Sequence, residues 1–408
     1  MNRRLLLELR FVLLLFIMFF PIIGRGVTGI LMGLFVFLSV WGALIVKKRG
    51  KIAKRKISYL ILFSSPVWAS LISLIYTENI NHALSDLGRF VMLALFPLAF
   101  FLSPPRFSFR QKKLLFSTFL SANVLVVLIS FFYLGLVGGF TQIIEAKNPS
   151  YTLRTSFTDF TSIHPTYAGI SFAFCLILLI LFEKSALTQL FTLDRVRYVL
   201  ITLFIISLSL LQSRMPLIAL VFIIVLITIM STYSNKRLKR KSLLVRGLFL
   251  LVIVFSSLFF SPRIKELIES DYKSPTPETK GSVNIRIGIL DCTKQLLKDH
   301  WIIGLGRGDV QDGLNNCYKD YSVKYSQIVN HNTHNQYFDY WLSTGLLGLV
   351  LFMLSIVLPS IYALKGDNLL YFSFLLLFAI CFLTENILVR NYGIVLFGFY
   401  NSFFAFDR

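Results

Sequence analysis

The chain has 408 residues, of which 56% are hydrophobic, and it carries a formal net charge of +21. With a mean hydropathy of +0.72, this composition excludes a soluble globular protein, which needs far more polar surface. The positive excess favours basic loops beside anionic lipid headgroups over nucleic-acid binding, because the sequence has no soluble domain rich in basic and aromatic residues.

About a dozen apolar stretches recur along the chain, each of roughly the length needed to cross ~30 Å of hydrocarbon. Because they are continuous rather than alternating, they predict membrane-spanning helices. The predicted spans are residues 8–23, 27–46, 57–76, 87–103, 114–137, 165–182, 197–212, 215–232, 243–260, 337–363, 368–384 and 391–407. The first resembles a signal peptide, but it lacks a clear cleavage site and is predicted to stay as a span.

Basic residues predict how these spans are oriented. Seven follow the second span (KKRGKIAKRK), four follow the fourth (SPPRFSFRQKK) and five follow the eighth (NKRLKRK). The short connections on the other side, such as IIGRGV and LQSRMP, hold one each. By the positive-inside rule the first set faces the cytoplasm, and with twelve spans both termini do too.

The predicted outer side carries two longer segments. Residues 138–164 form a modest loop, and residues 261–336 form a large polar loop between membrane segments 1–260 and 337–408. Within the large loop, apolar residues at helical spacing predict a helix that lies over the membrane domain or in its interface. These residues are Ile285, Ile289, Leu296 and Leu297.

Two of the four cysteines are candidates for a disulfide. Cys175 and Cys381 lie inside predicted spans, where we expect them to pack as small apolar groups. Cys292 and Cys317 both lie in the large outer loop, where an oxidising compartment would let them pair. Two free thiols are the alternative.

Ionisable residues gather at the outer ends of the predicted spans, where such groups in membrane proteins usually serve a function. Arg214 follows Ser213 in a tight hairpin between the seventh and eighth spans, and Arg286 leads the predicted loop helix. The other candidates lie just before a span or in the last outer turn: Arg154 and His164, His331, His334 and Asn335, and Glu385 and Arg390.

These residue types suit an anionic, lipid-linked substrate. A guanidinium matches phosphate oxygens and stays charged at every relevant pH, and one charge pair at ~4 Å contributes roughly 4 kcal/mol at an effective dielectric near 20. A histidine beside such a site can take the proton of an attacking hydroxyl, which accelerates a reaction by about 10²–10⁴-fold. The set favours glycosyl or phosphoryl transfer from a polyprenyl diphosphate without a metal or another cofactor.

Each candidate also has a structural interpretation. Arg214 can extend from an interfacial helix towards the headgroups. Arg286 and Arg154 can be solvated loop charges, and His334 can cap a helix.

Four motifs for binding a metal or a phosphate are missing. No H-E-x-x-H or C-x-x-C frames the histidine pair as a zinc site. GLGRGD at 304–309 lacks the G-K-[ST] ending of a P-loop, so it predicts a turn, with close approach to a substrate as the second interpretation. No D-x-D pair lies on the predicted outer face, which argues against a metal-held nucleotide-sugar donor.

Three stretches form a recognisable set. They are the Ser213–Arg214 hairpin, IRIGILDCTKQLLKDHWIIGLGRGD at 285–309 and HNTHNQYFDYWLSTGLLGLVLFM at 331–353. In order and spacing the chain resembles the O-antigen ligase and O-antigen polymerase superfamily of bacterial inner-membrane glycosyltransferases. The resemblance implies an all-α polytopic membrane protein of the C-type glycosyltransferase kind, with about twelve transmembrane helices and one large periplasmic loop containing helices.

The resemblance also implies roles for individual residues in an inverting, metal-independent transfer from an undecaprenyl-diphosphate-linked glycan. The essential arginines and histidine of the family match Arg214, Arg286 and His334, and Arg154 is a weaker match. The family segment often reads His-x-His-Asn, and its second histidine aligns with His334. Arg390 is a further candidate for the diphosphate, and the supporting candidates are Asn335, His331, Ser213, His164 and Glu385.

The acceptor separates the alternatives within the superfamily. A ligase gives the glycan to lipid A-core, a polymerase gives it to another lipid-linked glycan, and a third type gives it to a protein hydroxyl. The compact loop 138–164 favours the ligase. A transporter of lipid-linked glycans is the alternative from another class, but the predicted spans carry almost no charge in their middles. The expected partners are the donor, the acceptor and membrane lipids.

Overall fold

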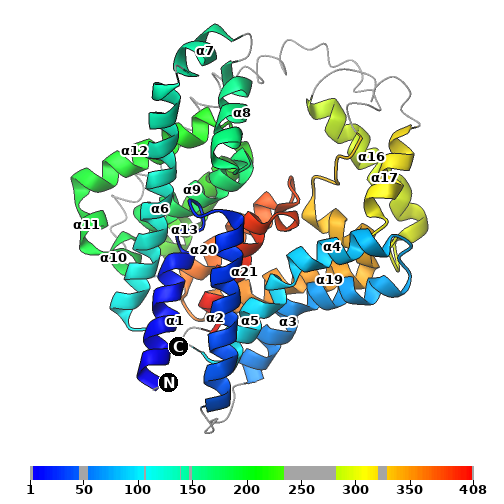
Figure 1. Cartoon of the computed structure of the whole chain (residues 1–408), viewed down its shortest axis with the longest axis horizontal. Coiled ribbons are helices and arrows are strands. Elements are labelled where there is room, and N and C mark those ends of the chain that lie inside the picture. The colour runs from blue at the N-terminus through cyan, green and yellow to red at the C-terminus, as the bar shows by residue number, and fades with distance from the viewer. Residues whose placement is uncertain are drawn as a thin grey trace.

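The structure is a computed structural model in which residues 3–45, 54–104, 107–137, 139–146, 149–233, 282–319 and 329–406 are described. Within these ranges the chain folds into helices joined by turns (Figure 1). The first half contains α1 (Arg3–Ile17), α2 (Arg25–Ile45), α3 (Lys54–Ile72), η1 (Ser73–Ile75), α4 (Ile80–Phe90), α5 (Met92–Leu102), α6 (Phe109–Leu136), α7 (Gly139–Glu145), α8 (Pro149–Thr161) and α9 (Pro165–Ile180). The second half contains α10 (Glu183–Ala186), α11 (Gln189–Thr192), α12 (Asp194–Leu210), α13 (Arg214–Tyr233), α16 (Ser282–His300), α17 (Val310–Lys319), α19 (Gln336–Lys365), α20 (Leu369–Cys381), η2 (Ile387–Val389) and α21 (Asn391–Phe406).

The protein is a polytopic helical membrane protein. Among the described residues, five helices are long and apolar enough to cross a membrane, or six if the bent pair α8–α9 is one span. The five are Gly26–Ile45, Lys54–Ile75, Ile80–Leu102, Phe109–Leu136 and Gln336–Lys365. The predicted ninth span, 243–260, lies outside the described residues.

Several predicted boundaries agree with the helices and two segments differ. Helices α9 and α21 begin at the predicted residues 165 and 391. Helix α1 ends at Ile17 and turns fill the rest of the first predicted span, because Pro21 and Gly24 follow. Residues 138–164, predicted as a loop, contain α7 and α8, and α8 meets α9 at an angle of 84°.

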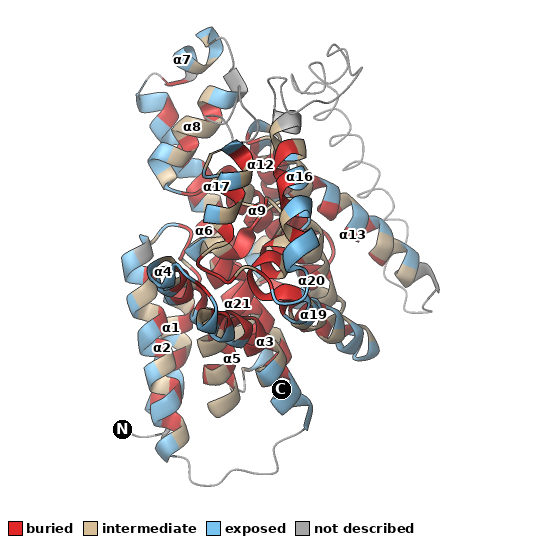
Figure 2. Ribbon diagram, turned by 90° about the vertical axis from the view of Figure 1, so that its right-hand side faces the viewer, coloured by how far each residue is buried: buried red, intermediate tan, exposed pale blue. Residues whose placement is uncertain are grey.

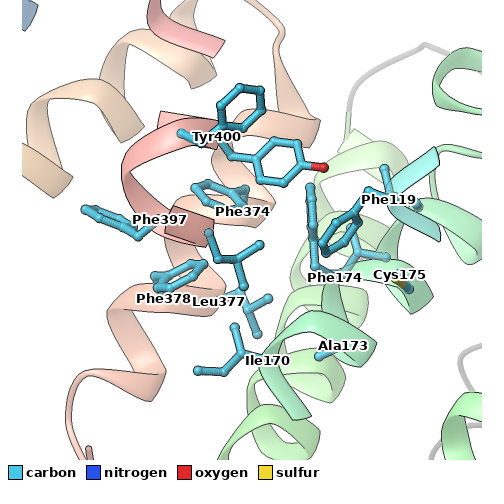
Figure 3. Close-up of a cluster of buried hydrophobic side chains, with 14 of the residues drawn as sticks. Phe119, Ile170, Ala173, Phe174, Cys175, Phe374, Leu377, Phe378, Phe397 and Tyr400 are labelled. Atoms are coloured by element: carbon cyan, nitrogen blue, oxygen red, sulfur yellow. The ribbon is translucent and has the colours of Figure 1, made fainter. Parts of the chain in front are cut away.

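Helix α9 is the central helix of the bundle. It is buried almost all round, as a helix that is apolar on every face must be. Phe174 packs its ring 5.1 Å from that of Tyr400 on α21 and 5.2 Å from that of Phe374 on α20 (Figure 3). This aromatic core fixes α9, and with it His164 at the start of the helix, relative to α20 and α21.

The two ends of the bundle differ in what they carry. Helices α7, α8, α16 and α17 lie at the upper end in both views, and α1 begins at the lower end (Figures 1 and 2). Arg10 of α1 donates hydrogen bonds to the Ser103 hydroxyl and carbonyl after α5. The outer surface of α2 is apolar and exposed, as expected for a lipid-facing helix, with Ile30 at 65% and Leu44 at 71% exposure.

Helices α16 and α17 form a small unit that rests on α19. The helix predicted from residues 285–297 is present as α16, and a disulfide between Cys292 and Cys317 joins it to α17. Their shared apolar core includes Ile289, Leu314 and Leu342, the last from α19.

A kink in α19 receives the chain that connects α16 to α17. At Gly345 the backbone has φ +67°, and a Cβ there would lie 2.0 Å from the Ile302 carbonyl oxygen. Only glycine permits this conformation and this approach. The amide of Leu346 donates to the carbonyls of Trp301 and Ile302, so the connection satisfies a donor that the kink leaves free.

Candidate functional site

Several chain connections meet at the upper end of α9. The side chain of His164 caps α9, where Pro165 takes the first helical position. The Ser213 hydroxyl donates to the Pro165 carbonyl at 2.8 Å, and the Tyr167 hydroxyl donates to the Asn386 carbonyl at 3.2 Å. These hydrogen bonds therefore hold together the connections before α9, before α13 and before α21. All three were predicted to lie on the outer side of the membrane.

His334 lies in the turn before α19. Its backbone has φ +46°, a conformation in which histidine is enriched among non-glycine residues, and its amide donates to the Asn332 side chain at 3.0 Å. Asn335 is the N-cap of α19, since its side-chain oxygen accepts from the Tyr337 and Phe338 amides. The interpretation of His334 as the helix cap is therefore wrong, and its imidazole remains for another role.

Glu385 connects His334 with Arg286. One carboxylate oxygen lies 3.3 Å from Nδ1 of His334 and the other 3.4 Å from Nη2 of Arg286. Burial alone would raise the pKa of Glu385, but the hydrogen bond from His334 and the charges of His334 and Arg286 outweigh burial and lower it. A carboxylate that is ionised only accepts hydrogen bonds, so Nδ1 of His334 is the donor in this pair.

His164 is a neutral imidazole within the electrostatic range of the same groups. Burial lowers its pKa to about 4, Glu385 acts in the opposite direction, and Arg390, Arg154 and His334 lower it further. Candidate residues from separate stretches of the sequence therefore shift the pKa of His164. At neutral pH, His164 accepts or donates a hydrogen bond without adding charge.

Arg214 reaches this region through the hairpin before α13. The hairpin packs tightly on α9, because a Cβ on Gly169 would lie 2.5 Å from that of Ser213. Arg214 begins α13 directly after Ser213, so the Ser213–Pro165 hydrogen bond fixes its backbone beside the His164 corner.

The α16–α17 unit holds the histidine segment from the other side. Gln311 and Tyr318 of α17 both donate to the carbonyl oxygen of His331, at 3.2 and 3.1 Å. The rings of His331 and His334 lie 5.7 Å apart. The Cys292–Cys317 disulfide therefore ties Arg286, which α16 carries, to the unit that positions the two histidines.

A buried ion network that the sequence did not predict lies beneath this site. Arg307, in the glycine-rich turn 304–309, is 3% exposed and pairs with Asp339 at 2.6 Å and with Asp86 at 3.0 Å. Asp339 also accepts from Asn386 at 3.1 Å, and Asn386 accepts from Thr333 at 3.1 Å. The network ends on the residues next to Glu385 and His334.

One signal in the sequence points to this network. Asp339 lies inside the predicted span 337–363, where an ionisable residue needs a partner. No such signal pointed to Arg307, because the turn 304–309 was interpreted only from its glycine residues. Burial would lower the pKa of Arg307, but Asp339 and Asp86 raise it, so the guanidinium stays charged.

A cavity of ≈ 450 Å³ opens beside His164. His164, Tyr167 and Arg390 line one part of it. The α1–α2 turn and the first turns of α2 also line it. The site therefore has an ionisable centre with an adjoining pocket of the size that ligands occupy, roughly 300–1,000 Å³.

Comparison with known proteins gives one family. Residues 198–353 match the family model described as O-antigen ligase. The matched range includes α13, α16, α17 and the first half of α19, and with them Arg214, Arg286 and His334. No curated protein matches the chain.

Proposed function

Since residues 198–353 belong to the O-antigen ligase family, we propose that the protein is an O-antigen ligase in a bacterial inner membrane. It moves a glycan from undecaprenyl diphosphate to a hydroxyl of lipid A-core on the periplasmic face, with inversion and without a metal. The observation that carries the proposal is the link His334–Glu385–Arg286 at the end of the bundle where His164, Arg154 and Arg390 also lie.

The proposed topology has both termini in the cytoplasm. About twelve segments cross the membrane, residues 261–336 form the large periplasmic loop, and residues 1–260 and 337–408 form the membrane domain. The shorter apolar helices Arg214–Met230 and Leu369–Cys381 cross together with the longer ones. Support comes from α1 beginning at the end of the bundle opposite to α8 and α16 (Figure 1).

His334 acts as the general base in this proposal. Glu385 holds the Nδ1 proton, so Nε2 takes the proton of the acceptor hydroxyl as its oxygen bonds to the anomeric carbon. The bond between that carbon and the diphosphate oxygen breaks on the opposite face of the sugar. The electron pair leaves with the diphosphate.

The arginines stabilise the leaving diphosphate. Arg286 is half exposed beside Glu385, so its guanidinium can reach a ligand as well as the carboxylate. Arg154 comes from α8, Arg214 from the start of α13 and Arg390 from the turn before α21. Their charges offset the negative charge that develops on the leaving group. Asn335, His331 and Ser213 support the site by holding its backbone.

A polymerase that transfers to a second lipid-linked glycan is the alternative, because the same chemistry serves both acceptors. The glycans of a deletion strain separate the two. A ligase defect leaves lipid A-core bare while lipid-linked polymer accumulates. A core that carries a single repeat unit indicates a polymerase.

Reconstitution tests the proposed reaction directly. Purified protein in lipid nanodiscs, with undecaprenyl-diphosphate-linked glycan and lipid A-core, should form glycosylated core with a chelator present. Activity that disappears with chelator and returns with a divalent cation would contradict a metal-independent transfer. Movement of the donor across a vesicle membrane without any transfer would indicate a transporter instead.

Replacing Arg214 by lysine tests the use of a guanidinium. A lysine keeps the charge but cannot form two parallel hydrogen bonds to a phosphate, so R214K should lose most of the transfer activity, by about tenfold or more. Steady-state transfer rates measure the loss. The matched control is R195K at an exposed position on α12, which should keep wild-type activity; equal rates for R214K and wild type would refute the role.

A further inference from the structure

The chain between α16 and α17 exposes three apolar residues in a row. Trp301, Ile302 and Ile303 are 47%, 58% and 62% exposed, and we call them the tip of the α16–α17 unit. Single apolar side chains are common on protein surfaces, whereas a contiguous apolar patch usually marks an interaction site. The tip therefore faces an apolar partner rather than water alone.

The carbonyl oxygens of the tip bind protein donors and do not depend on water. Those of Trp301 and Ile302 accept from the Leu346 amide. That of Ile303 accepts from the Tyr76 hydroxyl at 2.8 Å. Irregular backbone can lie at hydrocarbon depth only where the protein satisfies its polar groups. The tip meets this requirement for its carbonyl groups.

Helix α19, on which the tip rests, has a lipid-facing side. It is a candidate membrane span over Gln336–Lys365. Leu347, Val350, Met353 and Val357 recur every three or four residues, which places them on one face of the helix. They are 42–65% exposed. This face begins one residue after the amide that binds the tip.

Helix α3 has a second lipid-facing side next to the tip. It belongs to the candidate span Lys54–Ile75. Trp68, Ile72 and Ile75 lie at helical spacing and are 59%, 58% and 85% exposed. The next residue is Tyr76, which donates to the tip, so the turn after η1 lies beside the α16–α17 connection (Figure 1). The tip and the exposed faces of two spans therefore form one continuous apolar surface.

Polar residues beside the tip limit how deeply it can enter a membrane. Asp299 and His300, directly before Trp301, are exposed. A carboxylate is costly in hydrocarbon, so this end stays at the level of the headgroups. Tryptophan is enriched at that level, because its ring is apolar and its N–H is polar. Only the short segment 301–303 is therefore suited to the lipid.

We infer that the tip inserts among the acyl chains of the membrane leaflet at this end of the bundle and anchors the α16–α17 unit to the bilayer. The inference goes beyond the proposed reaction and requires only that α3 and α19 cross the membrane. Lipid is the occupant because the tip continues the lipid-facing sides of both helices. The anchor lies at one end of α16 and Arg286 lies near the other, so lipid helps to hold the helix that carries this arginine.

A nitroxide attached at residue 303 measures the surroundings of the tip. The variant I303C is made in a C175S/C381S background, so that the label reacts at one position while Cys292 and Cys317 stay in their disulfide. The labelled protein is placed in vesicles of phosphatidylethanolamine and phosphatidylglycerol. Molecular oxygen concentrates among acyl chains and a water-soluble nickel chelate stays outside them, so their effects on the electron paramagnetic resonance signal distinguish lipid from water.

Two exposed reference positions calibrate this measurement. L347C on α19 reports lipid, and K319C at the far end of α17 reports water. I303C should match L347C, with strong relaxation by oxygen and almost none by the chelate. Relaxation by the chelate as strong as at K319C would overturn the inference, since the tip would then lie in water. Weak relaxation by both reagents would also overturn it, because a second copy of the chain or another protein would then cover the tip.

Serine substitutions test whether the lipid contact holds the unit. I302S/I303S should lower the thermal midpoint in these vesicles by about 2–4 °C, because two isoleucines lose their contact with hydrocarbon. The matched control I144S removes an isoleucine of α7 that is 76% exposed, and should leave the midpoint unchanged. An unchanged midpoint for I302S/I303S would refute the anchor. Neither measurement involves glycan transfer, so the anchor and the proposed function fail separately.

Discussion

Individual side chains at the upper end of α9 define the proposed chemistry. The pair His334–Glu385 has the arrangement of a base and its orienting carboxylate, and Arg286 neutralises the same carboxylate from the other side. All three residues were candidates from the sequence, because ionisable residues at the outer ends of predicted spans are recognisable. The sequence did not indicate that Glu385 lies between the other two, since that depends on two turns meeting from different parts of the chain.

Removing the base or its partner should affect the reaction to different degrees. H334A should lose about 10²–10⁴-fold in kcat. E385Q keeps an acceptor for Nδ1 but loses the charge, and should lose about 10–100-fold. The control E78Q, at an exposed glutamate, should keep wild-type rates. Transfer rates at saturating donor measure the effect, and a fully active H334A protein at normal abundance would refute the assignment.

His164 should make stability depend on pH. Its pKa is about 4 in the folded protein against an ordinary value of 6.5, so the unfolded chain binds the proton more readily between these values. The stabilising contribution is therefore complete above about pH 6.5 and is lost as pH falls towards 4, by up to about 2 kcal/mol at pH 5.

An asparagine in place of His164 isolates this effect. Asparagine also caps helices but does not titrate, so the thermal midpoint of H164N should fall less than that of wild type between pH 7 and pH 5. Thermal unfolding in detergent at both pH values measures the difference. Equal falls for the two proteins would show that other groups cause the pH dependence.

At the scale of elements, the start of α19 is the best-fixed part of the site. Asn335 caps the helix, the Gln336 amide donates to the Phe382 carbonyl, and Asp339 binds Arg307 one turn later. Sequence patterns placed this helix within one or two residues at each end. They did not place the turn 304–309 against it, because a buried pair of opposite charges has no signature in local spacing.

Neutralising Asp339 should destabilise the protein. D339N leaves Arg307 buried with one carboxylate fewer, and breaking a buried ion pair costs about 3–5 kcal/mol. A lower thermal midpoint in detergent checks this, and D312N at an exposed position of α17 is the control. Thr333 permits a separate test of this network. T333V should lower the rate of glycan transfer, whereas T333S should keep it, because serine retains the hydroxyl that donates to Asn386. If T333S is as inactive as T333V, the hydroxyl does not position the site.

At the scale of the whole molecule, the sequence predicted the class of protein and the helix of the large loop. Continuous apolar stretches suffice to predict a polytopic helical membrane protein, because the bilayer requires helices of known length. They do not suffice to predict how many times the chain crosses the membrane. Helices such as α20, with 13 residues, are shorter than a standard span, and the predicted ninth span lies outside the described residues. The bend between α8 and α9 was also missed, since a helix that follows Pro165 gives no sign of its angle to α8.

Reducing the Cys292–Cys317 disulfide should loosen the unit that carries Arg286. The bond closes a loop of 25 residues, for which chain entropy gives roughly 3–4 kcal/mol. Reductant, or the double variant C292S/C317S, should therefore lower the thermal midpoint and reduce transfer. Cys175 and Cys381 are buried in the bundle, so the variant C175S/C381S should respond to reductant as wild type does. A C175S/C381S protein that no longer responds would show that the reductant acts on these two thiols and not on the disulfide.

The kink at Gly345 has a consequence for how the α16–α17 unit is held against α19. The backbone amide of Leu346 donates to the carbonyls of Trp301 and Ile302, which lie in the connection between α16 and α17. Lifting α16 and α17 away would expose that amide to hydrocarbon, at a cost of several kcal/mol. We therefore expect deuterium uptake at this single amide to report whether α16 and α17 stay packed on α19.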